Sequence, residues 1–204
     1  MNSNKQQVST VLRELEQIAK REHLPSIGPV KGKIISSIIK KHKPIAILEI
    51  GTLHGYSAIL MADSLCYNNG KMDGRLITIE LDKDFAETSR KNIAKAGLSH
   101  KIEVILGNAL DVIPTLTGHK FDLIFLDAVK DEYFNYLRSI EESDLIKEDS
   151  IIIADNVMIY ESEMQDYLQY VRNSGLYKSL TTETTLEFTK NVKDALEISF
   201  RLRK

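Results

Sequence analysis

Four short apolar runs, each carrying an acidic residue at or near its end, constrain this chain more than any other feature. The runs and their acidic residues are 45–51 with Glu49, 76–80 with Glu80, 121–127 with Asp127, and 151–156 with Asp155. Runs of this kind are typical of strands that are buried on both faces of a parallel sheet. Because ligands bind beyond the carboxyl ends of such strands, the acidic side chains are expected to converge at one edge of the sheet. Since like charges repel unless cations or hydroxyls lie between them, this convergence indicates a functional site.

The periodicity of the remaining chain predicts an α/β fold in one domain. Apolar residues recur at helical spacing from Val8 to Ala19 and from Val30 to Lys41, and strands then alternate with helices. The expected strands are 45–50, 76–80, 102–106, 121–127, 151–155, 177–182 and 196–202, and the expected later helices are 55–65, 82–97, 110–113, 131–139 and 161–173. Strand-helix alternation requires a mostly parallel sheet, and the closing pair of strands allows one antiparallel strand. The connector 183–194 is able to extend either closing strand.

Composition excludes several classes of partner. The 204 residues carry a net charge of −2, which gives no electrostatic reason to expect nucleic acid or an anionic membrane as partner. The basic stretch from Lys31 to Lys43 is interleaved with isoleucines and is interpreted as the solvated face of a surface helix. The polar start from Met1 to Gln7 lacks a signal peptide, and no apolar run approaches the roughly 20 residues that span a bilayer. A cytoplasmic protein is expected.

The single cysteine, Cys66, predicts a reducing compartment, because one thiol forms no internal disulfide. It falls near the end of a predicted helix, where we interpret it as a small packing residue. Turn residues follow at Asn68-Asn-Gly70 and Asp73-Gly74 and predict a loop before the second strand.

The turn after the first strand favours a ligand without phosphates. A dinucleotide fingerprint would place glycines at 51, 53 and 56, yet only Gly51 fits, because Leu53 and Tyr56 occupy the other two positions. A P-loop is absent as well. A positively charged group is able to sit beside Glu49, and Glu80 is placed to accept two ribose hydroxyls. A cationic nucleoside without phosphate indicates S-adenosylmethionine; in the alternative interpretation, nearby amides satisfy both glutamates.

A second set of residues suits a divalent cation. Asp127, Asp155 and Asn156 supply two carboxylates and an amide oxygen, which Mg²⁺ accepts. Lys130 lies three residues after Asp127, where a lysine beside a dication is able to act as a base. The alternative is a surface lysine that pairs with Asp131 or Glu132.

With these motifs in place, the chain resembles the cation-dependent O-methyltransferases that use S-adenosylmethionine, and within that family the catechol O-methyltransferases. The resemblance extends from about Val30 to the C-terminus. Its motifs are Val30-Lys-Gly-Lys-Ile-Ile35, Leu48-Glu-Ile-Gly51, Gly55-Tyr-Ser57, Arg75 to Glu80, Phe125-Leu-Asp127 with Lys130 and Tyr133, Ala154-Asp-Asn-Val157, and Leu186-Glu-Phe188. It implies a Rossmann-like class I methyltransferase fold with seven strands and helices on both faces. The N-terminal helices, residues 1–43, are expected to cover the site, and the first helix could equally contribute to a dimer.

The resemblance also implies a role for each matched position. The cation would be held by Asp127, Asp155 and Asn156, and Lys130 would take the proton from the substrate hydroxyl. The substrate would be bound by Lys130, Asn156 and Glu187, with Glu187 holding the second hydroxyl. S-adenosylmethionine would be bound by Ile27, Gly28, Glu49, Gly51, Tyr56, Ser57, Glu80, Ala109 and Asp127. In this set Glu49 would contact the amino end of the methionine moiety, Ser57 its carboxylate, and Glu80 the ribose.

The chain departs from the animal catechol enzymes at positions near these motifs. It has no tryptophan, and Val129 stands where those enzymes place a tryptophan in the substrate slot. Ala109 and Leu110 lack the polar side chains found at the adenine-contact positions. Substrate walls and adenine recognition are therefore expected to differ.

The expected function is transfer of a methyl group from S-adenosylmethionine to one hydroxyl of a catechol-like vicinal diol, with Mg²⁺ or another divalent cation. The alternatives are a catalytically silent S-adenosylmethionine-binding scaffold, and a methyltransferase for another small-molecule or macromolecular acceptor. Enzymes that methylate exocyclic amines carry an Asn/Asp-Pro-Pro-Tyr element after the fourth strand, where this chain has Asp127-Ala-Val-Lys130. The sequence leaves monomer and homodimer open.

Overall fold

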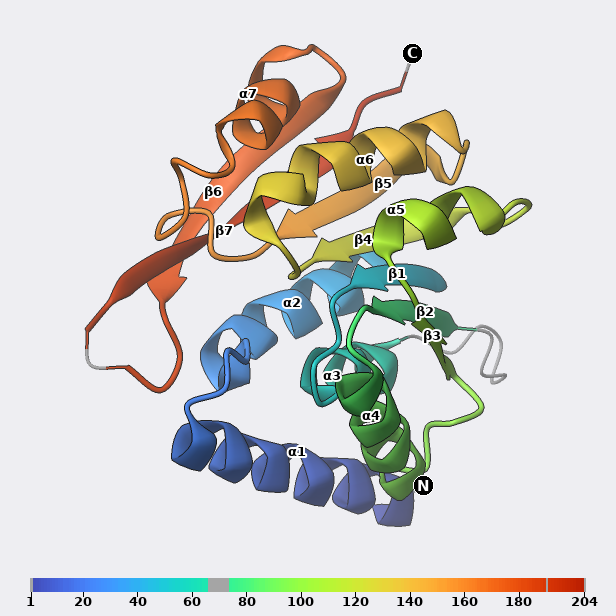
Figure 1. Ribbon diagram of the computed structural model, residues 1–204, viewed down its shortest axis with the longest axis vertical. Helices are drawn as coiled ribbons and strands as arrows, with labels where there is room; N and C mark the ends of the chain where they lie inside the picture. The colour runs from blue at the N-terminus through green and yellow to red at the C-terminus, as the bar shows by residue number, and fades with distance from the viewer. Residues whose placement is uncertain (1, 66–73, 190, 204) are drawn as a thin grey trace.

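The computed structural model describes residues 2–65, 74–189 and 191–203, and in them seven strands form one sheet (Figure 1). The strands lie in the order β3-β2-β1-β4-β5-β7-β6. Their bounds are β1 Ala46–Ile50, β2 Arg75–Glu80, β3 Ile102–Leu106, β4 Phe121–Leu126, β5 Ile146–Ala154, β6 Tyr177–Thr185 and β7 Lys193–Arg201. Only β7 runs against its neighbours in this sheet, pairing antiparallel with β5 and β6. The predicted α/β class, seven strands and single antiparallel strand are confirmed.

Helices cover both faces of the sheet (Figure 1). One face packs against α5, α6 and α7, and the other packs against α2, α3 and α4. Helix α1 lies outside this second layer, across α3 and α4. The helical bounds are α1 Asn2–Glu22, α2 Gly28–His42, α3 Tyr56–Ser64, α4 Lys83–Lys95, α5 Ala109–Val112, η1 Ile113–Thr115, η2 Lys130–Glu132, α6 Tyr133–Glu142 and α7 Gln165–Asn173.

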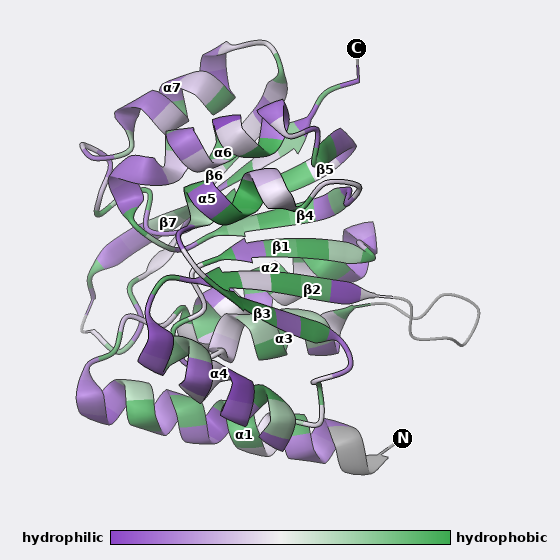
Figure 2. Cartoon of the chain, turned by 45° about the vertical axis from the view of Figure 1, so that its right-hand side comes forward, coloured by the Kyte–Doolittle hydropathy of each residue, from purple (hydrophilic) through white to green (hydrophobic). Residues whose placement is uncertain are grey.

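Successive residues of the central strands face opposite cores, which explains their continuous apolar sequence. In β1, Leu48 and Ile50 belong to the core under α5–α7, whereas Ile47 belongs to the core under α2–α4. Figure 2 shows the central strands as predominantly hydrophobic and the helices as mixed. Each fully buried leucine or isoleucine stabilises the fold by about 1.5–3 kcal/mol relative to an exposed one. Glu49 shares the α3 side of β1 with Ile47, so a carboxylate occupies a core position.

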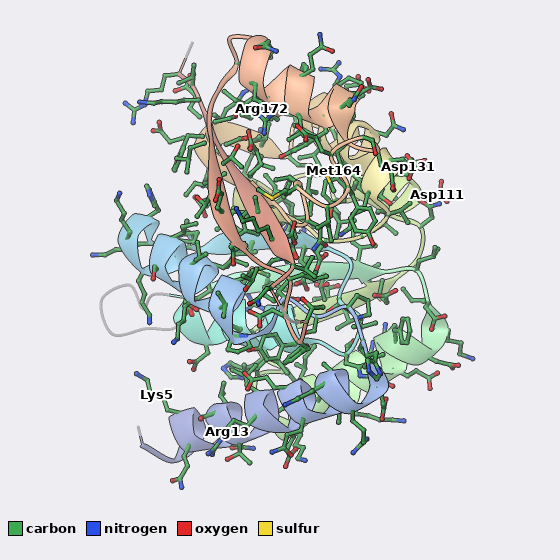
Figure 3. All side chains as sticks on the ribbon, turned by 90° about the vertical axis from the view of Figure 1, so that its left-hand side faces the viewer. Lys5, Arg13, Asp111, Asp131, Met164 and Arg172 are labelled. Carbon is green, nitrogen blue, oxygen red and sulfur yellow. The ribbon has the colours of Figure 1, made fainter. Side chains whose placement is uncertain are left out.

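The N-terminal helix is amphipathic, as its sequence predicts. Val8, Val11 and Leu15 are buried against the rest of the protein, while Lys5 and Arg13 extend away from it (Figure 3). Within the described ranges, none of the helices combines the length and apolar character needed to span a membrane.

Several boundaries differ from the expectations. Strand β5 begins at residue 146 rather than 151. Helix α7 begins at 165 rather than 161, because residues 157–164 form turns and a bend after Asn156. Both closing strands extend into the connector, where Thr184 pairs with Asp194. Helix α4 is capped by Asp82, whose side chain accepts hydrogen bonds from the Asp84 and Phe85 amides. Cys66 and the predicted loop at 68–73 lie outside the described residues.

Candidate active site

A cavity of about 1020 Å³ opens at the carboxyl ends of β1, β2, β4 and β5. Its walls are completed by the segment from α1 to the start of α2 and by the residues that follow β6. Of the site residues predicted from sequence, the following line the cavity: Ile27, Gly51, Tyr56, Ser57, Glu80, Ala109, Asp127, Lys130, Asp155, Asn156 and Glu187. The two predicted residues that do not line it are Gly28 and Glu49. The topology therefore gathers side chains from distant parts of the sequence at one edge of the sheet.

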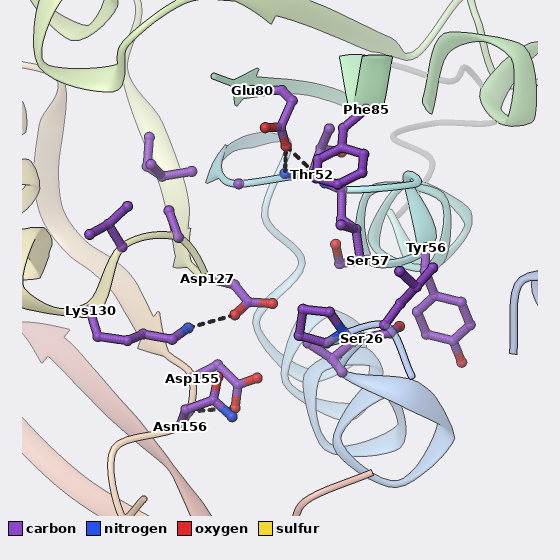
Figure 4. Close-up of a pocket in the computed structure, with 18 of the residues that line it drawn as sticks. Ser26, Thr52, Tyr56, Ser57, Glu80, Phe85, Asp127, Lys130, Asp155 and Asn156 are labelled. Carbon is purple, nitrogen blue, oxygen red and sulfur yellow. Dashed lines mark hydrogen bonds and ion pairs between the residues drawn. The ribbon is translucent and has the colours of Figure 1, made fainter. Parts of the chain in front are cut away.

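Asp127, Asp155 and Asn156, which we call the oxygen cluster, lie at the tips of two paired strands (Figure 4). Leu126 of β4 pairs with Ala154 of β5, and the next residue of each strand is an aspartate. The Asp155 amide donates to the Leu126 carbonyl at 3.0 Å, which fixes the two tips side by side. The predicted neighbourhood of these residues is thus observed.

Lys130 points into this cluster rather than into solvent. Its Nζ lies 2.9 Å from Asp127 Oδ1 and 2.8 Å from the Tyr133 hydroxyl. The side chain is partly buried, and its ammonium lies 5.2 Å from the centre of the Tyr133 ring. The alternative partners Asp131 and Glu132 do not hold it.

A buried lysine that the sequence interpretation missed contacts the oxygen cluster. Lys31 was expected on a solvated face, and this expectation is wrong, because its side chain is 1% exposed. Its Nζ lies 2.5 Å from Asp155 Oδ1 and 2.6 Å from Asp194 Oδ2. Burial lowers the pKa of Lys31, but the two carboxylates more than reverse this and leave it above its ordinary value. Burial and the charge of Asp127 raise the pKa of Asp155 despite Lys31.

The oxygen cluster has the chemistry of a site for a hard cation. In the described residues no group of three His, Cys, Asp or Glu side chains is arranged to hold a metal. The cluster instead combines two carboxylates with an amide. Asp127 and Asp155 each use one carboxylate oxygen for Lys130 or Lys31, and the other oxygen of each accepts no hydrogen bond from the described residues. Mg²⁺ accepts such a set and keeps waters or substrate in its remaining positions.

Glu49, which does not line the cavity, is a buried carboxylate without a hydrogen-bond partner among the described residues. It is fully buried inside β1, between Thr78 of β2 and Phe125 of β4, rather than beyond the strand end. Burial raises the pKa of Glu49 to about 7, more than the nearby Ser57 and Thr78 hydroxyls lower it. The interpretation that amides satisfy this carboxylate is therefore wrong.

Glu80, by contrast, is held by backbone amides. Its Oε2 accepts from Thr52 and Leu53 at 3.0 and 2.9 Å, and its Oε1 accepts from Asp82 at 3.0 Å (Figure 4). These bonds tie the turn after β1 to the tip of β2. Each carboxylate oxygen has two lone pairs, so Oε2 is fully used and Oε1 keeps one lone pair for a further donor.

The turn after β1 brings backbone close to the oxygen cluster. Gly51 has φ +89°, and a Cβ there would stand 2.4 Å from the Asp127 carbonyl oxygen, so only glycine fits. Helix α3 then begins at Tyr56, and Ser57 lies in its first turn, where free amides favour an anionic group. The Tyr56 hydroxyl is already used, because it donates to Glu16 of α1 at 2.7 Å.

Glu187 contacts the start of α2. Its Oε1 accepts from the Val30 amide at 2.6 Å and the Lys31 amide at 3.3 Å. A Cβ at Gly28, which has φ +56°, would stand 2.6 Å from the Glu187 side chain. Gly28 therefore makes room for Glu187, and Ile27 is buried beside it.

Comparisons with known proteins agree with this geometry. The sequence profile of the O-methyltransferase family matches residues 2–196. The chain is 37% identical over 183 residues to catechol O-methyltransferase B of Danio rerio, covering 88% of this chain and 66% of that protein. It is 35% identical over 181 residues to catechol O-methyltransferase of Bos taurus, covering 87% and 64%. The chain thus spans slightly less than two thirds of the length of these relatives.

Among solved structures, the O-methyltransferase TomG of Streptomyces achromogenes in complex with SAM superposes with a TM-score of 0.81. The two sequences are 25% identical, and the match covers 95% of this chain and 90% of TomG. The family profile, the relatives and the solved structure agree, and the chain belongs to the O-methyltransferase family.

Proposed function

We propose that this chain is a divalent-cation-dependent O-methyltransferase that transfers the methyl group of S-adenosylmethionine to one hydroxyl of a catechol-like vicinal diol. The observation that carries the proposal is the oxygen cluster, with the Lys130 amine 2.9 Å from Asp127 in the same cavity. The names of the two catechol O-methyltransferase relatives and the SAM complex of TomG support it.

The cofactor residues fit S-adenosylmethionine by charge. Glu49 is a buried carboxylate with no cation beside it, which suits the ammonium of the methionine moiety. Ser57, in the first turn of α3, suits its carboxylate. Glu80 suits the ribose hydroxyls, while Gly51, Asp127 and Ala109 complete the lining.

The N-terminal segment would cover the bound cofactor. Leu15 and Ala19 of α1, with residues 23–27 after it, contribute to the cavity wall. The Tyr56–Glu16 hydrogen bond ties α1 to α3 beside Ser57. We therefore assign residues 1–43 as a covering element of the same domain.

The residues that would hold the cation are Asp127, Asp155 and Asn156. A dication held there would supply positive charge that lowers the pKa of an acceptor hydroxyl and orients it.

Lys130 and Glu187 would act on the acceptor. Lys130 Nζ would take the proton from one hydroxyl, and S-adenosylmethionine, when bound, would supply the methyl group to that oxygen and leave as the neutral thioether. Glu187 Oε2, which carries no hydrogen bond to the described residues, accepts a hydrogen bond from the second hydroxyl. Orientation of the two reactants is able to contribute about 7–11 kcal/mol to such a transfer.

The test is methyl transfer from labelled S-adenosylmethionine to a panel of vicinal phenols, each matched with its monohydroxy counterpart. We expect transfer to the diols that requires Mg²⁺ and stops in excess chelator, and no comparable transfer to the monohydroxy phenols. Lys130→Ala should lower the turnover rate more than it weakens acceptor binding. Full activity in chelator would refute the cation dependence, whereas cofactor binding without transfer to any acceptor would favour the silent scaffold.

A further inference from the structure

We infer that Lys31 and Asp194 are positioning residues that decide which oxygens of Asp155 and Asn156 face the cation. The inference rests on the proposed function, since it concerns the cation site assigned there. Neither residue belongs to the oxygen cluster, and neither lines the cavity.

Lys31 and Asp194 form a buried ion pair behind the cluster. Their Nζ and Oδ2 atoms are 2.6 Å apart, and their side chains are 1% and 0% exposed. Lys31 comes from α2 and Asp194 from β7, so the pair joins two distant elements to the tip of β5. A buried pair of this kind needs further hydrogen bonds to offset its loss of hydration. Lys31 donates to Asp155, and Asp194 accepts from Asn156 and, at 3.5 Å, from the Ile159 amide.

Asp155 is held through one of its two carboxylate oxygens. Oδ1 accepts from Lys31 Nζ at 2.5 Å and from the Asn156 backbone amide at 2.7 Å. Two donors on the same oxygen fix the rotation of the carboxylate. Oδ2 is left as the oxygen available to a cation.

Asn156 is held through the nitrogen of its side-chain amide. Nδ2 donates to Asp194 Oδ2 at 2.8 Å. An ionised carboxylate only accepts hydrogen bonds, so the amide must turn its NH₂ toward Asp194 and its oxygen the other way. The backbone contributes, because Asn156 has φ +62°, a conformation that asparagine tolerates better than most residues.

The polarity of this hydrogen bond makes the inference specific. If residue 194 were able to donate a hydrogen bond, the Asn156 side-chain amide could rotate by 180° and turn its NH₂ group toward the cation. The partial positive charge of that group repels a cation. If residue 156 were an aspartate, a donor on residue 194 would not weaken cation binding, because either carboxylate oxygen is able to bind the cation. The effect of changing Asp194 should therefore depend on the residue at 156.

The experiment is a double-mutant cycle with Asp194→Asn, Asn156→Asp and the double variant, read out as the Mg²⁺ dissociation constant by calorimetry in the presence of S-adenosylmethionine. We expect Asp194→Asn alone to weaken Mg²⁺ binding about 10- to 100-fold, the range for residues that orient metal ligands. In the Asn156→Asp background, Asp194→Asn should weaken Mg²⁺ binding by less than about twofold. An equal penalty in both backgrounds, or none in either, would overturn the inference.

Glu197→Gln supplies the matched control. Glu197 is also a buried carboxylate of β7, but it pairs with Arg172 on α7, away from the cavity. Its substitution should leave Mg²⁺ and cofactor affinity within about twofold of wild type. A loss as large as that of Asp194→Asn would mean that any lost charge in β7 disturbs the site, and would overturn the specific role.

A measurement on the unsubstituted protein covers the case in which Asp194→Asn fails to fold. The side-chain amide resonances of Asn156, assigned by their loss in Asn156→Asp, should show slowed hydrogen exchange before Mg²⁺ is added and little change afterwards. Fast exchange that slows only with Mg²⁺ would show that the cation, not Asp194, orients the amide. If the wild-type protein binds no Mg²⁺ at all, the proposed function fails together with the inference; if it binds and Asp194→Asn binds equally well, only the inference fails.

Discussion

Two buried carboxylates on the central sheet, Glu49 of β1 and Asp155 at the tip of β5, differ in their hydrogen-bond partners. Both are almost inaccessible, at 0% and 2% exposure. Asp155 accepts hydrogen bonds from the Lys31 ammonium and the Asn156 amide, whereas Glu49 accepts none from the described residues. The protein supplies hydrogen-bond partners for one carboxylate and none for the other among the described residues. Under the proposed function, Asp155 would belong to a preorganised cation site, and Glu49 would be the partner of a cationic cofactor.

The strongest way to test this contrast is to remove the charge of Asp155 while keeping its shape. Asp155→Asn should lower cation-dependent methyl transfer at least about 10³-fold, because a cation site supplies several kcal/mol of charge stabilisation. Cofactor affinity should remain within a few-fold of wild type, since Asp155 is not a proposed cofactor contact. Parallel rate and cofactor-binding measurements check both parts. Retention of a tenth of the wild-type rate would contradict the assignment.

Glu49→Gln should give the reverse pattern with a smaller effect. Loss of the carboxylate removes the partner proposed for the cofactor's ammonium, so S-adenosylmethionine should bind about 10- to 100-fold more weakly, which corresponds to about 1.4–2.8 kcal/mol. Mg²⁺ affinity should stay near that of wild type. Calorimetric titration of each ligand separates the two effects. Equal weakening of both ligands would show that the two ends of the site are not independent.

The pH dependence of stability tests the same carboxylate without any ligand. Burial raises the pKa of Glu49 in the folded protein from 4.5 to about 7, so the folded state keeps a proton that the unfolded state has lost. The free energy of unfolding that Glu49 contributes should therefore fall as the pH rises from about 4.5 to about 7. Denaturant unfolding of wild type and Glu49→Gln across this range should show the variant gaining stability relative to wild type. A pH-independent difference would mean that Glu49 has an ordinary pKa.

The smallest expected effect concerns the covering helix. Tyr56→Phe removes the hydrogen bond to Glu16, which should cost about 0.5–1.5 kcal/mol of stability. The ring stays in the cavity wall, so cofactor affinity should change by no more than a few-fold. Thermal unfolding and cofactor titration provide the two values. A large loss of affinity with unchanged stability would place the hydroxyl itself in the binding site.

The strands and the oxygen cluster were predictable because their signals are local. A continuous apolar run identifies a strand that is buried on both faces, and the residue after it necessarily lies at the sheet edge. The spacing from Asp127 to Lys130 is equally local, since one short turn separates them. Strands that follow one another in a β-α series usually lie side by side, so the approach of Asp127 to Asp155 was expected without knowledge of the other side chains.

The buried ion pair was not predictable, because its signal is not local. Lys31 lies in a helix with Lys33, Lys40 and Lys41, and nothing in that stretch distinguishes the one lysine that is buried. Its burial depends on partners 124 and 163 residues away. Asp194 fell in a polar connector whose structure the pattern left open, and only the pairing of β7 with β5 and β6 brings it inside. The late start of α7 was also not predictable from a local pattern, because the chain turns after Asn156 before the helix begins.

The most direct measurement is a crystal structure of the protein with Mg²⁺ and S-adenosylmethionine bound. One oxygen from each of Asp127, Asp155 and Asn156 should lie about 2.0–2.1 Å from the cation. Lys31 should still contact the other oxygen of Asp155, and the cofactor's ammonium should lie beside Glu49. A cation bound elsewhere, or an Asp127 side chain outside ligand distance, would contradict the account.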